Sequence, residues 1–310
     1  MSIITSNGPL VLMYHGVPRE ARTQALDARA FEQHISFLKR NCTFIRPEQY
    51  ASARGSLRSP AVLLTFDDGF RNQAEVAAPI LRRYDVPAVF FVSSRHCTPG
   101  RYLWFSYLKM FSAFFAGKGV TLDGKFVSLQ GTDRKAGIQE LTSRLLSLKP
   151  HPHAMYAAID AQLPPVESFA SQAALADECA GMTEEQVREL GQDPLFTVGG
   201  HTVDHPYLTR CDATEAERQI SDNKTWIESV TGRICDLFAY PLADFDHNTV
   251  EQCRRGRFKQ AFGVRRKRIS YPQFATRRVG IYSTSLAVLG AKLLCRHYLP
   301  THWVSRLIRA

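Results

Sequence analysis

Two adjacent carboxylates, Asp67 and Asp68, directly follow the apolar run 61–66 and precede Gly69. A short apolar run bounded in this way predicts a buried strand, so the pair stands at a strand end. Like charges this close repel each other unless a cation or hydrogen bonds relieve them. A capping Asp in an ordinary loop would explain Asp-Asp-Gly alone, but the strand that leads straight into the pair favours a chemical role.

Two histidines four residues apart, His201 and His205, follow a second predicted strand at 195–198. Two imidazoles at this spacing can bind one metal ion if both rings face the same way. Pro206 disfavours helical geometry at His205, so we expect a turn at the strand end rather than a helix. Either pair alone is often incidental. Together, one carboxylate, two imidazoles and an open water position describe a catalytic metal site.

Such a site can hydrolyse an amide. One carboxylate binds the ion, and the other takes a proton from the bound water, whose pKa the ion lowers. His15, at the end of the run 10–14, is a candidate acid for the leaving amine, although a histidine at a strand end is more often structural. The turn after the run 237–240 offers backbone N–H groups that can stabilise an oxyanion.

Short apolar runs alternate with helical patterns along the chain. The predicted strands are 10–14, 61–66, 86–92, 195–198, 237–240, 260–264 and 279–282. The predicted helices begin at Asp27, about Gln73, the capping-box sequence 183–186 and Asp212. This alternation implies a mainly parallel sheet, either open or closed into a barrel. Active sites in both architectures lie at the carboxyl ends of the strands, where the candidate residues stand.

Residues 98 to about 182 differ in character from the rest of the chain. The first part is aromatic, and the later part is rich in Ala, His and Pro. We expect a helical insertion or lid with a less ordered end. The aromatic side chains near Trp104 are expected in its core, although they could also cap or stack on a substrate.

The net charge of +10 over 310 residues has several interpretations. The basic residues could simply form a solvated surface, or they could bind an anionic substrate or an anionic membrane. No nucleic-acid-binding signature accompanies the charge. The seven scattered cysteines include no Cys-x-x-Cys, which favours reduced thiols over a disulfide framework or a zinc finger. The first residues lack the features of a signal peptide, so we expect a cytoplasmic protein.

The tail 283–310 mixes apolar residues with Lys and Arg. It is expected to form an amphipathic segment that packs on the barrel. The alternative is peripheral contact with the inner face of an anionic membrane. That contact would make a lipid-linked amino sugar the natural substrate.

Three sequence motifs resemble those of the polysaccharide deacetylase (NodB-homology) family, carbohydrate esterase family four. LLTFDDGF resembles its first motif, GGHTVDHPYL its second and, more weakly, FAYPLAD its third. VLMYHGV resembles the branch of poly-N-acetylglucosamine deacetylases whose last motif lies at the N-terminus. The likeness is weak across the insertion and absent in the tail. It implies a distorted (β/α) barrel over residues 1–282 and metal-assisted N-deacetylation of an amino sugar or glycan.

The resemblance also implies a role for each motif residue. Asp67 corresponds to the general base and His15 to the catalytic acid, and the backbone N–H of Leu242 would help to hold the oxyanion. The implied ligands of Zn²⁺, or alternatively of Co²⁺, Ni²⁺ or Mn²⁺, are Asp68, His201 and His205.

The third motif departs from the family pattern. Ala239 stands where many members carry an Arg that orients the base, and Leu242 and Ala243 replace the usual Tyr-Gly. We expect Arg277 or Arg278 to supply the missing cation. The departure leaves two alternatives to a deacetylase. One is a deformylase or other amide hydrolase acting on a lipid-linked amino sugar, and the other is a catalytically silent glycan-binding protein.

Overall fold

The computed structural model describes residues 8–53, 60–148, 152–264 and 270–298. Seven parallel strands close into a barrel, because β1 pairs with β10 on one side and with β3 on the other. Their order around the barrel is β1 (Leu10–Tyr14), β10 (Thr276–Gly280), β9 (Gln260–Gly263), β8 (Leu237–Ala239), β7 (Phe196–Gly200), β4 (Ala88–Val92) and β3 (Ala61–Phe66). A short β2 (Thr43–Phe44) pairs with the start of β3. The predicted (β/α) barrel is confirmed.

The strands lie close to their predicted positions, with one exception. All residues of β1, β3 and β4 are buried, as expected for strands of a parallel sheet that is covered on both faces. The strand predicted at 279–282 is β10, which begins three residues earlier, at Thr276. Two arginines near its centre, Arg277 and Arg278, interrupt the apolar pattern, so the sequence predicted the start of this strand too late.

Helices surround the barrel. They are α1 (Ala28–Asn41), α2 (Ala78–Arg83), α7 (Glu184–Gln192), α8 (Ala213–Thr231), α9 (His247–Arg255) and α10 (Leu286–Tyr298). Of these, α1, α7 and α8 begin where their capping residues predict. Asp27 and Asp212 accept N-terminal amides of α1 and α8, and Thr183 forms the predicted capping box with Gln186. The helix predicted from Gln73 begins with a π-helical segment, η2 (Gln73–Ala77).

Short helical turns connect these elements. They are η1 (Pro47–Gln49), η3 (Ser94–Cys97), η4 (Gly131–Asp133), η5 (Val166–Ser168), α6 (Gln172–Ala174), η6 (Leu175–Cys179), η7 (Leu208–Arg210), η8 (Pro241–Ala243) and η9 (Pro272–Ala275).

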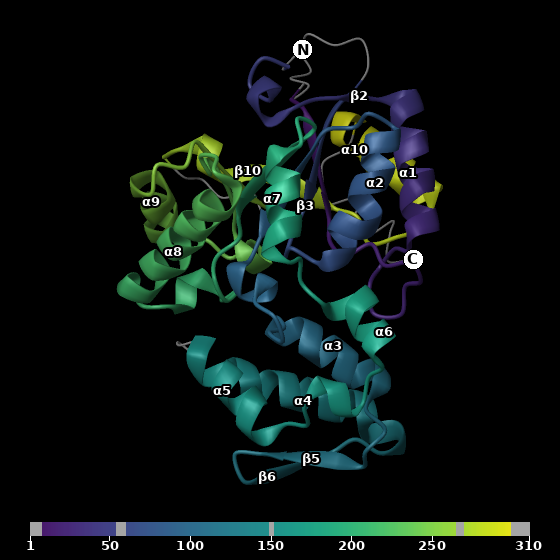
Figure 1. Ribbon diagram of the computed structural model, residues 1–310, viewed down its shortest axis with the longest axis vertical. Helices are drawn as coiled ribbons and strands as arrows, with labels where there is room; N and C mark the ends of the chain where they lie inside the picture. The colour runs from purple at the N-terminus through teal and green to yellow at the C-terminus, as the bar shows by residue number, and fades with distance from the viewer. Residues whose placement is uncertain (1–7, 54–59, 149–151, 265–269, 299–310) are drawn as a thin grey trace.

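The insertion forms a separate layer below the barrel in the view of Figure 1. It contains α3 (Trp104–Phe114), a hairpin of β5 (Gly119–Leu122) and β6 (Lys125–Ser128), α4 (Arg134–Ser147) and α5 (Pro152–Gln162), around a hydrophobic core of its own. The hairpin was not predicted, although Asp123-Gly124, both with positive φ, is a common two-residue hairpin turn. The prediction of a less ordered end is wrong, because α5 and α6 form in this part of the insertion.

The described part of the C-terminal tail packs on the barrel. Helix α10 lies against α1, and its Leu289 and Leu293 are buried. The Lys292 ammonium donates to the Gly280 carbonyl at the end of β10 over 2.6 Å. Residues 299–310, which carry much of the predicted basic character, lie outside the described residues. Among the described helices, none has the length and apolar character that a bilayer span requires.

Candidate active site and metal centre

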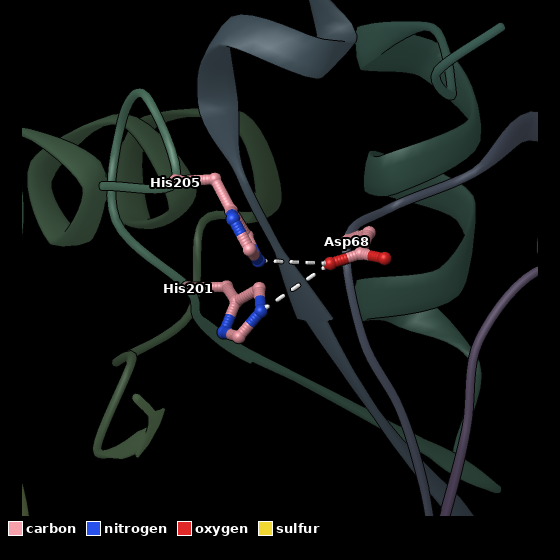
Figure 2. A group of neighbouring side chains, drawn as sticks. All are labelled: Asp68, His201 and His205. Atoms are coloured by element: carbon pink, nitrogen blue, oxygen red, sulfur yellow. Dashed lines mark ion pairs between the residues drawn. The ribbon is translucent and has the colours of Figure 1, made fainter. Parts of the chain in front are cut away.

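Asp68, His201 and His205 meet at the carboxyl ends of two barrel strands. Figure 2 shows both imidazoles pointing toward the Asp68 carboxylate. The Oδ1 atom of Asp68 lies 3.4 Å from Nε2 of His201 and 3.3 Å from Nε2 of His205. Asp68 follows β3 and the histidines follow β7, with β4 between the two strands. All three side chains are buried.

The backbone at these residues adopts conformations that side chains usually avoid. Asp68 has φ of +81° and His205 has φ of +53°, both in the left-handed region. This turn separates the neighbouring carboxylates, because Asp68 faces the histidines while Asp67 faces the last strand of the barrel. His96 steadies the turn, since its ring nitrogens lie 3.1 Å from the Asp68 carbonyl and 2.8 Å from the Cys179 carbonyl. Strained backbone of this kind concentrates at functional sites.

The hydrogen-bonding pattern of this trio fits a metal ion. Nδ1 of His201 lies 2.8 Å from the Ala239 carbonyl, which fixes the proton on Nδ1 and leaves a lone pair on Nε2. That lone pair faces a carboxylate oxygen, so two acceptors oppose each other unless a cation lies between them. The Oδ2 atom of Asp68 is also buried without a hydrogen-bond partner in the described chain.

The charge state of the trio suits the same interpretation. Burial alone would raise the pKa of Asp68, but the adjacent side chains of His201 and His205 hold it well below its usual range. Burial lowers the pKa of His205. A carboxylate and neutral imidazoles are the forms that bind metal ions.

The side chains of a second group, His153, Asp204 and Glu215, could also bind a metal ion, but they already contact an arginine. The Arg218 guanidinium lies 3.3 Å from Asp204, 2.8 Å from Glu215 and 3.1 Å from Nε2 of His153. Because this guanidinium occupies the space between the carboxylates, we interpret the group as an ion-pair network on the surface of α8.

Arg278 of β10 binds the other carboxylate of the pair. Its two terminal nitrogens donate to Oδ1 and Oδ2 of Asp67 over 2.5 and 2.7 Å. Burial alone would raise the pKa of Asp67, but the Arg278 charge outweighs it and keeps the pKa below its usual value. Of the two arginines expected to replace the family cation, Arg278 is therefore the one that contacts Asp67, while Arg277 lines a different cavity.

A cavity of about 610 Å³ opens onto both carboxylates. His15 and Leu242, the remaining predicted site residues, line it. Burial lowers the pKa of His15 against the opposing effect of Asp68 and Asp67, and Nδ1 of its ring is buried without a hydrogen-bond partner in the described residues. The structure therefore brings all six predicted site residues to one cavity.

The turn at Leu242 lies beside this cavity. Leu242 and Ala243 both have positive φ, at +57° and +54°. The Ala243 and Asp244 amides donate to the Tyr240 and Pro241 carbonyls, and the Leu242 amide takes no part in these two turn bonds. This arrangement is compatible with an N–H group that binds an oxyanion.

Some residues around the site were not predicted from the sequence. Asn223 accepts the His201 amide over 2.9 Å and donates to the Val92 carbonyl over 3.0 Å. The sequence contains a signal for this role, because Asn223 interrupts the apolar face of α8 between Ile220 and Ile227.

Helix α3 of the insertion also contributes to the site. The Trp104 indole N–H donates to the His205 carbonyl over 3.2 Å, and the Phe105 ring centre lies 4.7 Å from the His205 ring centre. Trp104 is buried, as its expected core role requires, whereas Phe105 lines the cavity. The sequence did not distinguish these two neighbouring aromatic residues.

Solved structures share this fold. The Streptococcus pyogenes deacetylase PplD in complex with acetate is 18% identical, with a TM-score of 0.57 over 94% of this chain and 99% of that chain. IcaB from Ammonifex degensii is 19% identical, with a TM-score of 0.58 over 94% of this chain and 97% of that chain. A de-N-acetylase from Aggregatibacter actinomycetemcomitans is 18% identical, with a TM-score of 0.54, and covers 91% and 98% of the respective chains. The comparison with curated proteins finds no similar sequence.

A family model described as polysaccharide deacetylase matches residues 54–109 and 160–261, which is just over half of the chain. The matched segments contain both carboxylates, both histidines and Leu242, and the gap between them falls inside the insertion. The chain therefore belongs to the polysaccharide deacetylase family, the hydrolases that act on carbon–nitrogen bonds of acetylated sugars.

Proposed function

We propose that this protein is a metal-dependent N-deacetylase that converts the acetamide of an amino sugar or amino-sugar glycan to the free amine and acetate. The observation that supports this most directly is the division of the carboxylate pair. Asp68 faces two imidazoles, and Asp67 is held separately by Arg278 at the same cavity. Amide hydrolysis needs these two roles, a metal ligand and a base, at adjacent positions.

Asp68, His201 and His205 would hold the ion, and one oxygen with two nitrogen ligands suits Zn²⁺, with Co²⁺, Ni²⁺ or Mn²⁺ as alternatives. When bound, a divalent ion polarises the amide carbonyl and lowers the pKa of a coordinated water.

Asp67 is the proposed base. Its Oδ2 lies 4.0 Å from Nε2 of His201, so it stands beside the metal-ligand group without belonging to it. The ion pair with Arg278 keeps it ionised and fixes its orientation. Asp67 therefore takes a proton from the attacking water, whose oxygen forms a bond to the carbonyl carbon.

His15 and Leu242 complete the proposed reaction. The Leu242 N–H stabilises the oxyanion, and His15 donates a proton to the nitrogen as the carbon–nitrogen bond breaks. Because burial lowers the pKa of His15, its ring is neutral in the resting enzyme. It must therefore take up a proton before it acts as an acid, and the proton that Asp67 removes from the water balances the one that His15 gives to the amine.

Release of acetate and formate from N-acetyl and N-formyl amino sugars tests the proposal, with zinc- or cobalt-loaded protein and Asp67→Asn as the blank. We expect acetate from the wild type and none from the variant. Formate without acetate would indicate the deformylase alternative. Absence of both products from every soluble and lipid-linked substrate would favour a binding protein.

A further inference from the structure

The insertion presents one aromatic and one cationic side chain to the cavity. Phe105 and Lys109 stand four residues apart on α3, so they share one face of the helix, and both line the cavity. The Lys109 ammonium lies 5.7 Å from the centre of the Phe105 ring. Phe105 in turn contacts His205, which places Lys109 one side chain further from the metal-ligand group. The Phe105 ring thus neighbours both the Lys109 ammonium and one member of the metal-ligand group.

The positive charge of Lys109 is not balanced inside the cavity. Among the described residues that line it, Asp67 and Asp68 are the only acidic ones. Arg278 neutralises Asp67, and a divalent ion would more than neutralise Asp68. No ion pair to Lys109 occurs among the described salt bridges. Lys109 is exposed, so its ammonium is available to a ligand.

Lys109 and His15 line the same cavity. Burial is the main cause of the lowered pKa of His15, and the charge of Lys109 contributes in the same direction. A substrate whose amide lies between the metal-ligand group and His15 would occupy the cavity that Lys109 also lines. A group attached to the sugar near its acylated nitrogen could reach this ammonium.

We propose that the substrate carries a negatively charged group of the phosphate-ester class beside its acylated amine, and that Lys109 binds this group. The inference rests on the proposed function, because it names the substrate class of the same site. A lysine ammonium is a compact charge with three rotatable donors, which suits a phosphate. Phe105 packs against the sugar between this phosphate and the metal-ligand group. A neutral chain of acetylated sugars would leave the Lys109 charge unpaired.

The test compares two substrates that differ in one group, N-acetylglucosamine 1-phosphate and its neutral methyl glycoside. The kcat/KM ratio of the two is measured for metal-loaded wild type, Lys109→Gln, Lys109→Arg and Lys125→Gln. Lys125 lies on the exposed hairpin of the insertion, so its variant removes the same charge from a distant place. Because both kcat/KM values of a ratio come from the same protein preparation, the ratio does not depend on the fraction of active protein.

We expect the wild type to prefer the phosphate by about tenfold or more, since hydrogen bonds to charged groups contribute strongly to binding. Lys109→Gln should reduce the ratio by about 5- to 20-fold, mainly through KM. Lys109→Arg should keep most of it, and Lys125→Gln should leave it unchanged. High salt should also reduce the wild-type ratio, because the ammonium is exposed.

A wild-type ratio near one, or an equal ratio in Lys109→Gln, would overturn the inference while leaving the deacetylase intact. If the wild type releases no acetate from either compound, the proposed function fails for these sugars. The affinities of wild type and Lys109→Gln for the same two ligands, measured by calorimetry, then test the inference without any need for turnover. Tighter binding of the phosphate that depends on Lys109 supports it, and equal or absent binding refutes it.

Discussion

Arg278 of β10 and Asp67, which follows β3, form an ion pair with two parallel hydrogen bonds of 2.5 and 2.7 Å. Both side chains are almost fully buried. In many members of the polysaccharide deacetylase family, an Arg in the third motif orients the base. In this chain, Ala239 stands at that position. Here a different strand supplies the guanidinium, so Asp67 has an arginine partner although the third motif lacks one.

Removal of the Arg278 charge should weaken the base at low pH. In Arg278→Gln the pKa of Asp67 rises, because burial then acts on a carboxylate without its cation. The acid limb of the kcat/KM profile should therefore move to higher pH, and kcat/KM at neutral pH should fall about 10- to 100-fold. Arg277→Gln on the same strand is the matched control, because Arg277 lines another cavity. Equal profiles for the two variants would exclude Arg278 as the partner that sets the pKa of Asp67.

Asp67→Asn should abolish turnover but keep the metal. Loss of a general base costs about 10²- to 10⁴-fold in rate, whereas the ligand group of Asp68, His201 and His205 stays intact. Acetate release and elemental analysis of the purified variant measure the two effects. Loss of the ion would reverse the roles assigned to the two carboxylates.

The same variant should be less stable, because it leaves the Arg278 guanidinium buried without a counter-charge. Breaking a buried pair on one side costs about 3–5 kcal/mol, which denaturant unfolding can measure. The double variant Asp67→Asn/Arg278→Met should recover much of this loss without recovering activity. The pKa of Asp67 is lowered in the folded protein, so its contribution is present above the unfolded-state value near 4 and is lost as pH falls through the folded value.

The chain should bind one catalytic ion. His205→Ala should remove that ion and the metal-dependent activity, while His153→Ala should retain both, because Arg218 already occupies the second group. Metal titration of the chelator-treated protein gives the stoichiometry and affinity. Binding should weaken as pH falls, since protons compete for the imidazoles. A second equivalent of metal that disappears in His153→Ala would contradict this assignment.

His15→Gln distinguishes an acid from a structural histidine. An amide nitrogen must be protonated to leave, whereas 4-nitrophenolate leaves without a proton. We therefore expect acetamide hydrolysis to fall by about 10²- to 10⁴-fold, with a much smaller effect on 4-nitrophenyl acetate. A similar loss on both substrates would mean that His15 supports the site rather than protonating the leaving group.

Glu178, at the end of the insertion, should stabilise the loop between β1 and α1. Its buried carboxylate accepts the Arg22, Thr23 and Gln24 amides and the Thr23 hydroxyl. Glu178→Ala leaves these amides unsatisfied and should lower the free energy of unfolding by about 3 kcal/mol. Glu185→Ala, which removes an exposed carboxylate from α7, should change it by less than about 0.5 kcal/mol. Equal unfolding midpoints for the two variants would show that the loop does not depend on Glu178.

The sequence predicts the barrel well because its strands are short apolar runs between capped helices. Asp67, Asp68, His201 and His205 could be identified because each pair directly follows such a run. Partners from distant segments could not be assigned to a single residue, because sequence spacing does not determine side-chain direction. The sequence left Arg277 and Arg278 as alternatives, and the closure of the barrel between β1 and β10 brings Arg278 to Asp67.

The insertion shows a second limit. Its helices and aromatic residues were expected, but the contribution of α3 to the cavity depends on how the layer sits on the barrel. Phe105 and Trp104 are adjacent in sequence and differ in role because one faces the cavity and the other the core. Periodicity indicates which residues share a face, but it does not indicate what that face meets.

The attachment of the insertion has a consequence for chimaeric proteins. Residues 177–182 lie within the predicted insertion, yet they bind the β1–α1 loop, the His96 ring and the Gly69 carbonyl. A graft that exchanged 98–182 as one cassette would remove these supports along with the helices. A junction placed before η6, near Ala174, would keep them with the recipient barrel. Specificity could then be transplanted between enzymes while each recipient retained its own reaction centre.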